Sequence, residues 1–496
     1  MPVAQATPLK LSTKLAYGIG ELGVAAPISV GIFLGLFFLT DVVGLRAGTA
    51  GTVLLLGRVW DGINDPLTGW LSDRTRSPWG RRYPWMVGAA LPLGVGCALQ
   101  WWVPPLGSES YLFMYYGGVS LLIYASFTAV QLPFTALAAE LTPHYDERTS
   151  LTTYKAGFNL AGGILGLLMA QVIFAVIDNP RQQYLALGIA LGVLAVGSIA
   201  IAVMGTYPRY CQVRLDRISG RQPGQRRQRV SPRSQGDWLL SGLPRAFFRL
   251  SSGMGKILGS LIDNAPFCGL VALYLCSWLG IQVTAAMLPY FVQRVMALPE
   301  NHVIQMAIAV QATAILALPG WNQLAQRTSK KTVYVMGAPI AIAGLMVLGG
   351  IQPGQMSLMY GCAMAVGFGI ATFYLVPLAM LPDVIDWDEL RTGQRREGLF
   401  VSVMVFLQKG AIAIALFLTA QLLDWLDRST LEPTAGLGTI RVLMSWLPGV
   451  TIGLGLVVIS RYGLSRDRHR VIQRRLQNIR SQRRLRSNAK PKEDNA

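Results

Sequence analysis

Four polar side chains interrupt an apolar stretch, "LLLGRVWDGINDPLTG", that covers residues 54–69. They are Arg58, Asp61, Asn64 and Asp65. Because successive residues of a helix are about 100° apart, all four lie within a sector of roughly 120° on one helix face. Carboxylate and amide oxygens suit a small hard cation, and a carboxylate can also accept a proton. The spacing therefore predicts a cation or proton site. An ion pair between Arg58 and Asp61 is the alternative, but it leaves Asp65 unexplained.

The composition places this polar face inside a membrane. Hydrophobic residues make up 52% of the 496 residues, charged residues make up 14%, and the mean hydropathy is +0.42, which excludes an ordinary soluble domain. The three histidines show no catalytic or metal-ligating spacing, so no enzymatic activity is expected. We expect an all-α membrane protein with twelve transmembrane helices. The apolar runs lie near 13–40, 48–72, 84–104, 109–140, 150–177, 183–206, 265–293, 301–325, 332–350, 355–381, 398–424 and 442–461.

The basic residues predict the orientation. Most of the 44 lysines and arginines fall in the segments that follow every second span and in the tail. Cytoplasmic loops carry such an excess, so we expect a multi-pass protein of the cell membrane with both termini in the cytoplasm. The net charge of +19 is concentrated in residues 209–256 and 461–496, which argues against nucleic acid binding. The tail is expected either to lie as a basic amphipathic helix on anionic lipid headgroups or to be solvated.

The chain also repeats itself. "GWLSDRTRSPWGRR" follows the second span and "GWNQLAQRTSKK" follows the eighth, with Gly-Trp, Arg-Thr and paired basic residues in both. Such a repeat is typical of transporters built from two related six-helix bundles. The expected parts are an N-terminal bundle (1–207), a basic linker (208–256), a C-terminal bundle (257–463) and a basic tail (464–496). The side chains expected to act in gating at the inner ends are Arg58, Asp73, Arg81, Arg82, Asp383, Asp386 and Arg395.

Two longer motifs carry a family resemblance. "GRVWDGINDPLTGW" and "MLPDVIDWDELRTGQRREGLFVSVMVFLQKG" resemble the signatures of glycoside-pentoside-hexuronide:cation symporters, the major facilitator family that includes melibiose permease and the sodium:galactoside symporters. "KLAYGIGELG" and "TDVVGL" extend the resemblance to the first span. It implies alternating access to a midplane site and a coupling Na⁺ or H⁺, with no other cofactor. In that family a threonine of the fourth span joins the motif, so the implied cation site is Asp61, Asn64, Asp65 and Thr128.

The resemblance is weaker at the substrate site. Where the family has acids in the first and fourth spans, this chain has Ala25 and Gln131, and a family tryptophan position holds Thr135. Two basic positions are kept, as Lys155 and Lys409. Lysines that have lost their acidic partners would be poorly paired in the empty protein. This pattern predicts an anionic group on the substrate: a uronate, a sulfated or phosphorylated sugar, or a lipid phosphate.

Other interpretations of these polar residues remain open. In the main alternative, Lys409 pairs with Asp61 or Asp65 and takes part in coupling the cation to the substrate. A separate alternative is that Lys155 extends toward the inner membrane surface. Glu21 either lines the cavity or supports a helix contact. In the seventh span, Trp278, Gln282 and Tyr290 suit a midplane cavity, with core packing as the alternative.

The expected function is cation-coupled symport of a sugar, glycoside or uronate-like solute by a monomer. Cation binding at Asp61 and Asp65 would neutralise the cavity and admit the substrate. Vertebrate lysophosphatidylcholine symporters resemble the same motifs and also lack the sugar-binding acids, so an amphiphilic cargo is the first alternative. A transport-inactive scaffold or sensor is the second, and the retained Asp61, Asp65 and Lys409 argue against it.

Overall fold

The computed structural model describes residues 9–142, 145–218, 261, 263–394, 396–429, 433–464 and 466–488, and within them it contains helices and no strand. The first half consists of α1 (Leu11–Phe37), the π-helical η1 (Phe38–Val42), α2 (Ala47–Arg74), α3 (Tyr83–Gln100), α4 (Glu109–Leu141), α5 (Tyr145–Val176) and α6 (Pro180–Ile218). The second half consists of α9 (Ala265–Tyr290), the π-helical η2 (Phe291–Val295), α10 (Glu300–Arg327), α11 (Lys330–Gly350), α12 (Met356–Thr392), α13 (Glu397–Ser429) and α14 (Pro433–Ser460). A last helix, α15 (Arg466–Asn488), follows.

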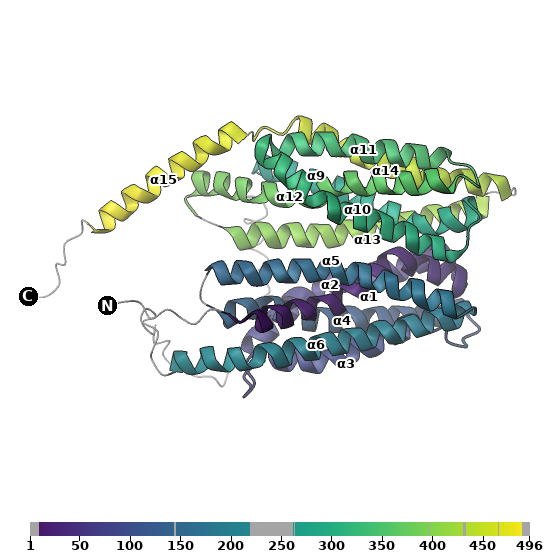
Figure 1. The fold of residues 1–496 in the computed structure, drawn as a ribbon, viewed down its shortest axis with the longest axis horizontal. Coiled ribbons are helices and arrows are strands. Elements are labelled where there is room, and N and C mark those ends of the chain that lie inside the picture. Colours follow the sequence, from purple (N-terminus) through teal and green to yellow (C-terminus); the bar gives the residue numbers. More distant parts are fainter. Residues whose placement is uncertain are drawn as a thin grey trace, which may run out of the picture.

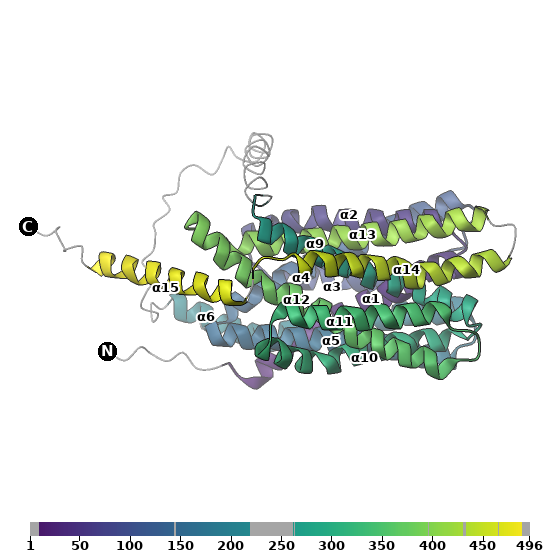
Figure 2. The ribbon, with the colours of Figure 1, turned by 90° about the horizontal axis from the view of Figure 1, so that it is seen from above.

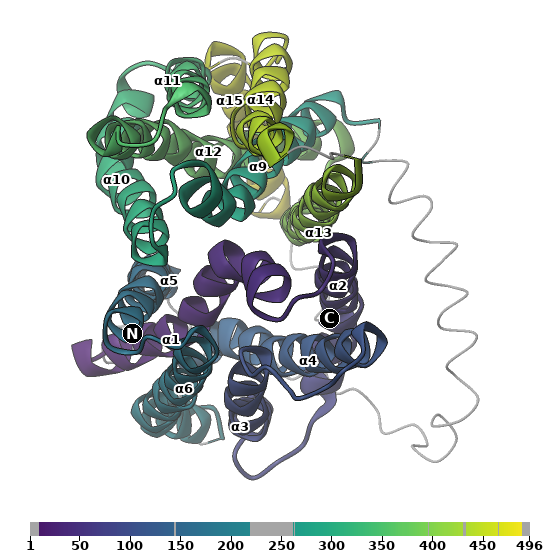
Figure 3. The same ribbon diagram turned by 90° about the vertical axis from the view of Figure 1, so that its right-hand side faces the viewer.

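The helices form two bundles that lie side by side (Figure 1). Helices α1 to α6 pack together in one bundle and α9 to α14 in the other, and α2–α13, α5–α10 and α1–α9 meet along the interface (Figure 3). Ten of the described helices are long and apolar enough to cross a membrane. Helices α2 and α3 complete the bundles but are not among these ten. Helix α2 carries the polar face. The all-α fold of two six-helix bundles predicted from the sequence is confirmed.

The backbone repeats at the end of the first helix of each half. Helix α1 continues into η1 and α9 into η2, both five residues long. A residue with positive φ follows each segment: Gly44 at 87° and Ala297 at 54°. Glycine adopts this conformation readily, whereas alanine is strained there. The two halves therefore match in local conformation at this end, which we call the far end. The opposite end, where α1 begins and α15 projects, is the terminal end (Figure 2).

Small residues allow α1 to pack tightly at the centre of the first half. A Cβ atom on Gly162 of α5 would lie 2.4 Å from the carbonyl oxygen of Leu22, and one on Gly166 would lie 2.8 Å from that of Ala26. Glycine at these positions lets the two helix backbones approach each other closely. As a result α5 lies directly against α1, next to the buried Glu21.

Helices α12 and α6 extend well beyond the expected boundaries. Helix α12 continues to Thr392 and ends at Gly393, whose φ is 71°. Asp383 and Asp386, expected in a loop, therefore lie on a helix. Helix α6 continues into the expected linker, of which residues 219–256 lie outside the described part of the chain. Helix α15 forms in the basic tail, where a basic amphipathic helix was one of the two expected alternatives.

Candidate cation and substrate site

The polar face of α2 meets α4 and α13 at two carboxylates. Thr128 of α4 donates a hydrogen bond to Asp61 Oδ1 at 3.0 Å and lies 3.2 Å from Asp65 Oδ1. Lys409 Nζ of α13 lies 2.9 Å from Asp61 Oδ2 and 2.6 Å from Asp65 Oδ2. Asp61 is buried and Asp65 is half-buried. One hydroxyl and one ammonium group thus bridge the same two carboxylates. We call these four residues the cation cluster.

Asn64 lies beside the cation cluster. Its side chain accepts a hydrogen bond from Thr68 at 3.1 Å and donates one to the carbonyl oxygen of Ala125 at 3.4 Å. Three of the four expected cation ligands therefore come together, while the amide of Asn64 is bonded to its own helix and to α4.

Arg58 contacts an aromatic ring. Its guanidinium carbon lies 5.1 Å from the centroid of the Tyr124 ring, and its Nε is buried without a hydrogen-bond partner among the described residues. In the described part of the chain no ion pair joins Arg58 to Asp61. The alternative of an ion pair within α2 is therefore wrong, because a lysine from the other half pairs with Asp61.

A second group of polar side chains surrounds Glu21 of α1. The buried carboxylate accepts hydrogen bonds from Gln131 Nε2 at 3.1 Å and from Asn159 Nδ2 at 2.9 Å. Lys155 Nζ lies 3.5 Å from Glu21 and donates a hydrogen bond to Thr135 Oγ1 at 2.6 Å. We call these five residues the Glu21 cluster. It joins α1, α4 and α5, and it includes three of the expected substrate-binding residues.

These contacts correct the expectation that the two lysines lack acidic partners. Lys155 faces Glu21, and Lys409 faces the two aspartates of the cation cluster. The family motifs do not identify Glu21 as the partner of Lys155, because the first-span acid of the family corresponds to Ala25. Glu21 lies four residues earlier, about one helical turn, and so on the same side of α1. That periodicity was the only signal in the sequence for its role.

The three expected residues of the seventh span are divided between two places. Gln282 and Trp278 each have a buried nitrogen, Nε2 and Nε1, without a hydrogen-bond partner among the described residues. Trp278 also packs edge-on against Tyr374, with ring centroids 5.5 Å apart. Tyr290 instead lies at the far end, where its hydroxyl is 2.6 Å from Thr40 Oγ1. The first two residues offer hydrogen-bond donors in the second half, and Tyr290 helps to join the halves.

Contacts between the halves close the far end. Arg294 Nη2 of η2 lies 2.7 Å from Asp41 Oδ1 of η1, beside the contact between Thr40 and Tyr290. The cation cluster is a further link, because Lys409 belongs to the second half and its aspartates to the first. The structure therefore has a closed far end with the lysine inserted between the two carboxylates.

Ion pairs tie neighbouring helices at the terminal end of each half. Of the expected gating residues, Asp386 lies 3.1 Å from His469 of α15, and Arg395 is outside the described residues. Three further ion pairs use basic residues of the repeated sequence motif, Arg81 and Arg82 in the first half and Lys330 in the second. The motif indicated these basic residues but not all of their acidic partners. The three pairs are Asp73–Arg82 at 2.5 Å, Glu140–Arg81 at 2.7 Å and Asp383–Lys330 at 2.7 Å.

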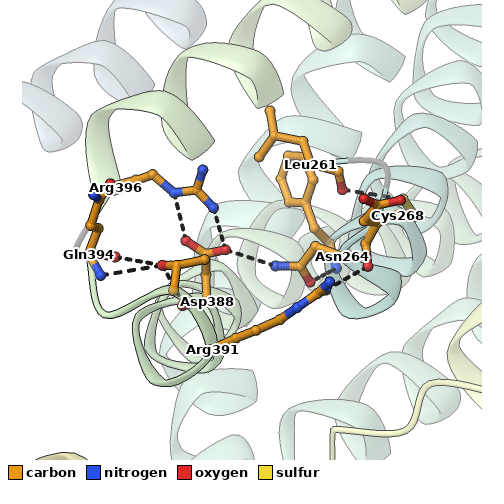
Figure 4. A network of polar contacts seen from close by, with 10 residues as sticks. Leu261, Asn264, Cys268, Asp388, Arg391, Gln394 and Arg396 are labelled. Carbon is orange, nitrogen blue, oxygen red and sulfur yellow. Dashed lines mark hydrogen bonds and ion pairs between the residues drawn. The ribbon is translucent and has the colours of Figure 1, made fainter. Parts of the chain in front are cut away.

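Figure 4 shows a polar network at the terminal end that the sequence motifs did not indicate. Arg396 donates from Nη2 and Nε to the buried Asp388, at 2.7 and 3.0 Å. Asn264 Nδ2 lies 3.5 Å from the same carboxylate, and its Oδ1 accepts a hydrogen bond from the Phe267 amide at the start of α9. Asp388 lies two residues after Asp386, hence on a different helix face. The network joins the end of α12 to the starts of α9 and α13.

Comparisons with known proteins agree with this architecture. A family model described as MFS/sugar transport protein matches residues 16–226 and 251–466. An uncharacterized symporter of Synechocystis is 34% identical over 95% of this chain and 97% of that protein. The sodium-dependent lysophosphatidylcholine symporter 1 of Gallus gallus is 26% identical over 96% of this chain and 90% of that protein. The inward-open xylose transporter XylE of Escherichia coli shares the fold, with a TM-score of 0.60 at 14% identity over 91% of this chain and 96% of that one. The chain belongs to the MFS/sugar transport protein family and is a multi-pass membrane transporter, not an enzyme.

Proposed function

We propose that the chain is a cation-coupled symporter in which Lys409 occupies the cation site when no ion is bound. The position of Lys409 Nζ, within 2.9 Å of both carboxylates of the cation cluster, carries the proposal. A Na⁺ ion or a proton bound at Asp61 and Asp65 competes with the ammonium group for the same oxygen atoms. Cation loading therefore releases Lys409 from the aspartates.

This competition supplies a physical basis for coupling. Asp61 and Asp65 belong to the first half and Lys409 to the second, so the ion pair also holds α2 against α13. A cation that replaces the ammonium removes an attraction between the halves. It thereby changes the free-energy difference between conformations that expose the site to opposite sides.

The proposed cargo is a hydroxyl-rich solute such as a sugar, glycoside or uronate. The Glu21 cluster combines carboxylate, amide, ammonium and hydroxyl groups, which are the groups that bond sugar hydroxyls. In the other half, Gln282 and Trp278 have nitrogen donors without protein partners among the described residues. Polar groups from several helices around a midplane cavity are typical of such sites.

A lysophospholipid is the second candidate cargo. The similarity to the lysophosphatidylcholine symporter of Gallus gallus, which extends over 96% of this chain, supports it. An amphiphile would place its phosphate near Lys409 or Lys155 and its acyl chain along apolar helix surfaces.

Uptake by liposomes containing the purified protein tests both candidates. Labelled sugars, uronates and lysophosphatidylcholine are offered with a Na⁺ gradient, a proton gradient or no gradient. Gradient-driven accumulation of one class that is lost in Asp61→Asn supports the proposal and identifies the cargo. Transport of any class at the same rate and to the same level in all three conditions contradicts cation coupling.

A further inference from the structure

A mostly apolar groove lies outside the cation and Glu21 clusters. It has a volume of about 940 Å³ and lies at the terminal end between α9, α12, α14 and α15. Its apolar wall is formed by Pro266, Ala272, Trp387, Leu390, Val458 and Ile472.

Three exposed arginines line the same groove. Arg461 follows the end of α14, and Arg468 and Arg475 lie on α15. The last two are seven residues apart, about two helical turns, so they project from the same face of α15. Arg468 Nη1 donates to the carbonyl oxygen of Gly463 at 2.9 Å, which holds the start of α15 near the end of α14. The groove thus combines an apolar wall with three positive charges.

Specific contacts dock α15 beside the groove. His469 lies 3.4 Å from Asp383 and 3.1 Å from Asp386, both on α12. Ile472 and Leu476 of α15 are buried. The basic tail is therefore packed against the second half over its first turns and forms one wall of the groove.

We propose that this groove binds an anionic phospholipid of the surrounding bilayer. The apolar span of α14 ends at Ser460 and that of α9 begins at Ala265, so the groove lies where the hydrocarbon layer gives way to the headgroups. Guanidinium groups bond phosphate oxygens in a bidentate manner. The lipid phosphate lies among the three arginines, and an acyl chain covers the apolar wall. This lipid is a bound partner of the second half and not the cargo, so the inference is independent of the proposed function.

Native mass spectrometry of the purified full-length chain tests the site. The protein is titrated with phosphatidylglycerol, with phosphatidylcholine of the same acyl chains, and with inorganic phosphate. We expect phosphatidylglycerol to bind about tenfold or more tightly than phosphatidylcholine, because charge-assisted hydrogen bonds to the arginines favour the anionic lipid. Inorganic phosphate should not displace it, because phosphate does not cover the apolar wall.

Two double variants of equal charge locate the binding. Arg468→Gln with Arg475→Gln should weaken phosphatidylglycerol binding about tenfold or more. Arg470→Gln with Arg474→Gln removes the same charge from α15 at positions that do not line the groove, and should leave the affinity within about twofold. Ala272→Phe keeps every charge but fills part of the apolar wall, and should also weaken binding. Thermal unfolding in lipid-free detergent checks that each variant is folded.

The outcomes distinguish specific lipid binding in the groove from general electrostatic attraction of anionic lipid to the basic tail. Equal losses in the two double variants, equal affinity for the two lipids, or full binding by Ala272→Phe would each overturn the proposal. Displacement by inorganic phosphate would replace the lipid with a soluble anion as the occupant, and so would also overturn it.

Discussion

Asp41 and Arg294 occupy equivalent positions in the two halves and bind each other across the far end. Each is the fourth residue of a π-helical segment, Phe38–Val42 in the first half and Phe291–Val295 in the second. Arg294 Nη2 lies 2.7 Å from Asp41 Oδ1. The two halves thus share the same backbone conformation at this position but carry side chains of opposite charge. Closure of the far end brings the two copies together as an ion pair.

Exchanging the two charges should preserve this closure. Arg294→Asp alone places two carboxylates together and should shift the population away from the closed far end. The side chains are 38% and 23% exposed, so the pair contributes about 0.2–1 kcal/mol, up to roughly a fivefold change in population. The double variant Asp41→Arg with Arg294→Asp should restore the distribution. Spin-label distances across the far end measure it. A double variant as open as the single one would show that the pair does not hold the far end closed.

Removing Lys409 should strengthen cation binding. Lys409→Gln deletes the ammonium group that competes for Asp61 and Asp65. We expect about a tenfold or larger gain in cation affinity, from the loss of a charge-assisted contact of roughly 1.5–3 kcal/mol. Calorimetric titration of the purified protein with Na⁺ at several pH values measures this gain. Lys155→Gln is the matched control, because it removes the same charge from the Glu21 cluster and should leave cation affinity nearly unchanged. Weaker cation binding by Lys409→Gln would contradict competition.

Neutralising either aspartate should abolish cation-driven accumulation. In Asp61→Asn or Asp65→Asn, Lys409 keeps one carboxylate partner, so the protein should still reach the membrane. One remaining carboxylate offers the coupling ion less negative charge and fewer oxygen ligands, so the ion should no longer displace the ammonium group of Lys409. Uptake assays at matched membrane expression test this, with Glu21→Gln as a control that should alter substrate affinity but retain cation binding. Full Na⁺- or H⁺-driven uptake by either aspartate variant would mean that the cation binds elsewhere.

The sequence predicts local relationships and leaves distant ones open. Asp61 and Asp65 could be placed on one face because they are four residues apart on one helix. Their partner Lys409 is 344 residues from Asp65, and no periodicity connects the two. The sequence alone therefore could not decide whether Lys409 pairs with an aspartate or with an anionic substrate. The packing of α13 against α2 shows that it pairs with the aspartates. The end of α12 was missed for a different, local reason: its acidic residues lower the hydropathy, although the helix continues to Thr392.

The network in Figure 4 should contribute strongly to stability. Arg396→Gln leaves the buried carboxylate of Asp388 without its charged partner, which should cost about 3–5 kcal/mol. Adding Asp388→Asn should recover part of this loss, because the carboxylate is then neutral. Arg391→Gln is the control: Arg391 donates to the backbone carbonyl oxygen of Asp263 and is exposed, so the change should stay within about 0.5 kcal/mol. Thermal unfolding in detergent compares the four proteins. Equal, small shifts for Arg396→Gln and Arg391→Gln would contradict the prediction.

Charge selectivity for the substrate should depend on the bound cation. Without the cation, Lys409 is paired with two aspartates and Lys155 with Glu21, so an anionic substrate gains little from either lysine. Once the cation has displaced Lys409, its ammonium group can pair with a carboxylate or phosphate of the substrate. Such a contact is worth roughly 1.5–3 kcal/mol, a preference of about ten- to a hundredfold for a uronate over its parent sugar. Affinities for both, measured with and without saturating cation, should show this preference only in the loaded protein. Lys409→Gln should erase it, and Lys155→Gln should retain most of it. A preference of equal size without the cation would mean that the aspartates do not restrain Lys409, whereas no preference in the loaded protein would mean that the released lysine does not reach the substrate.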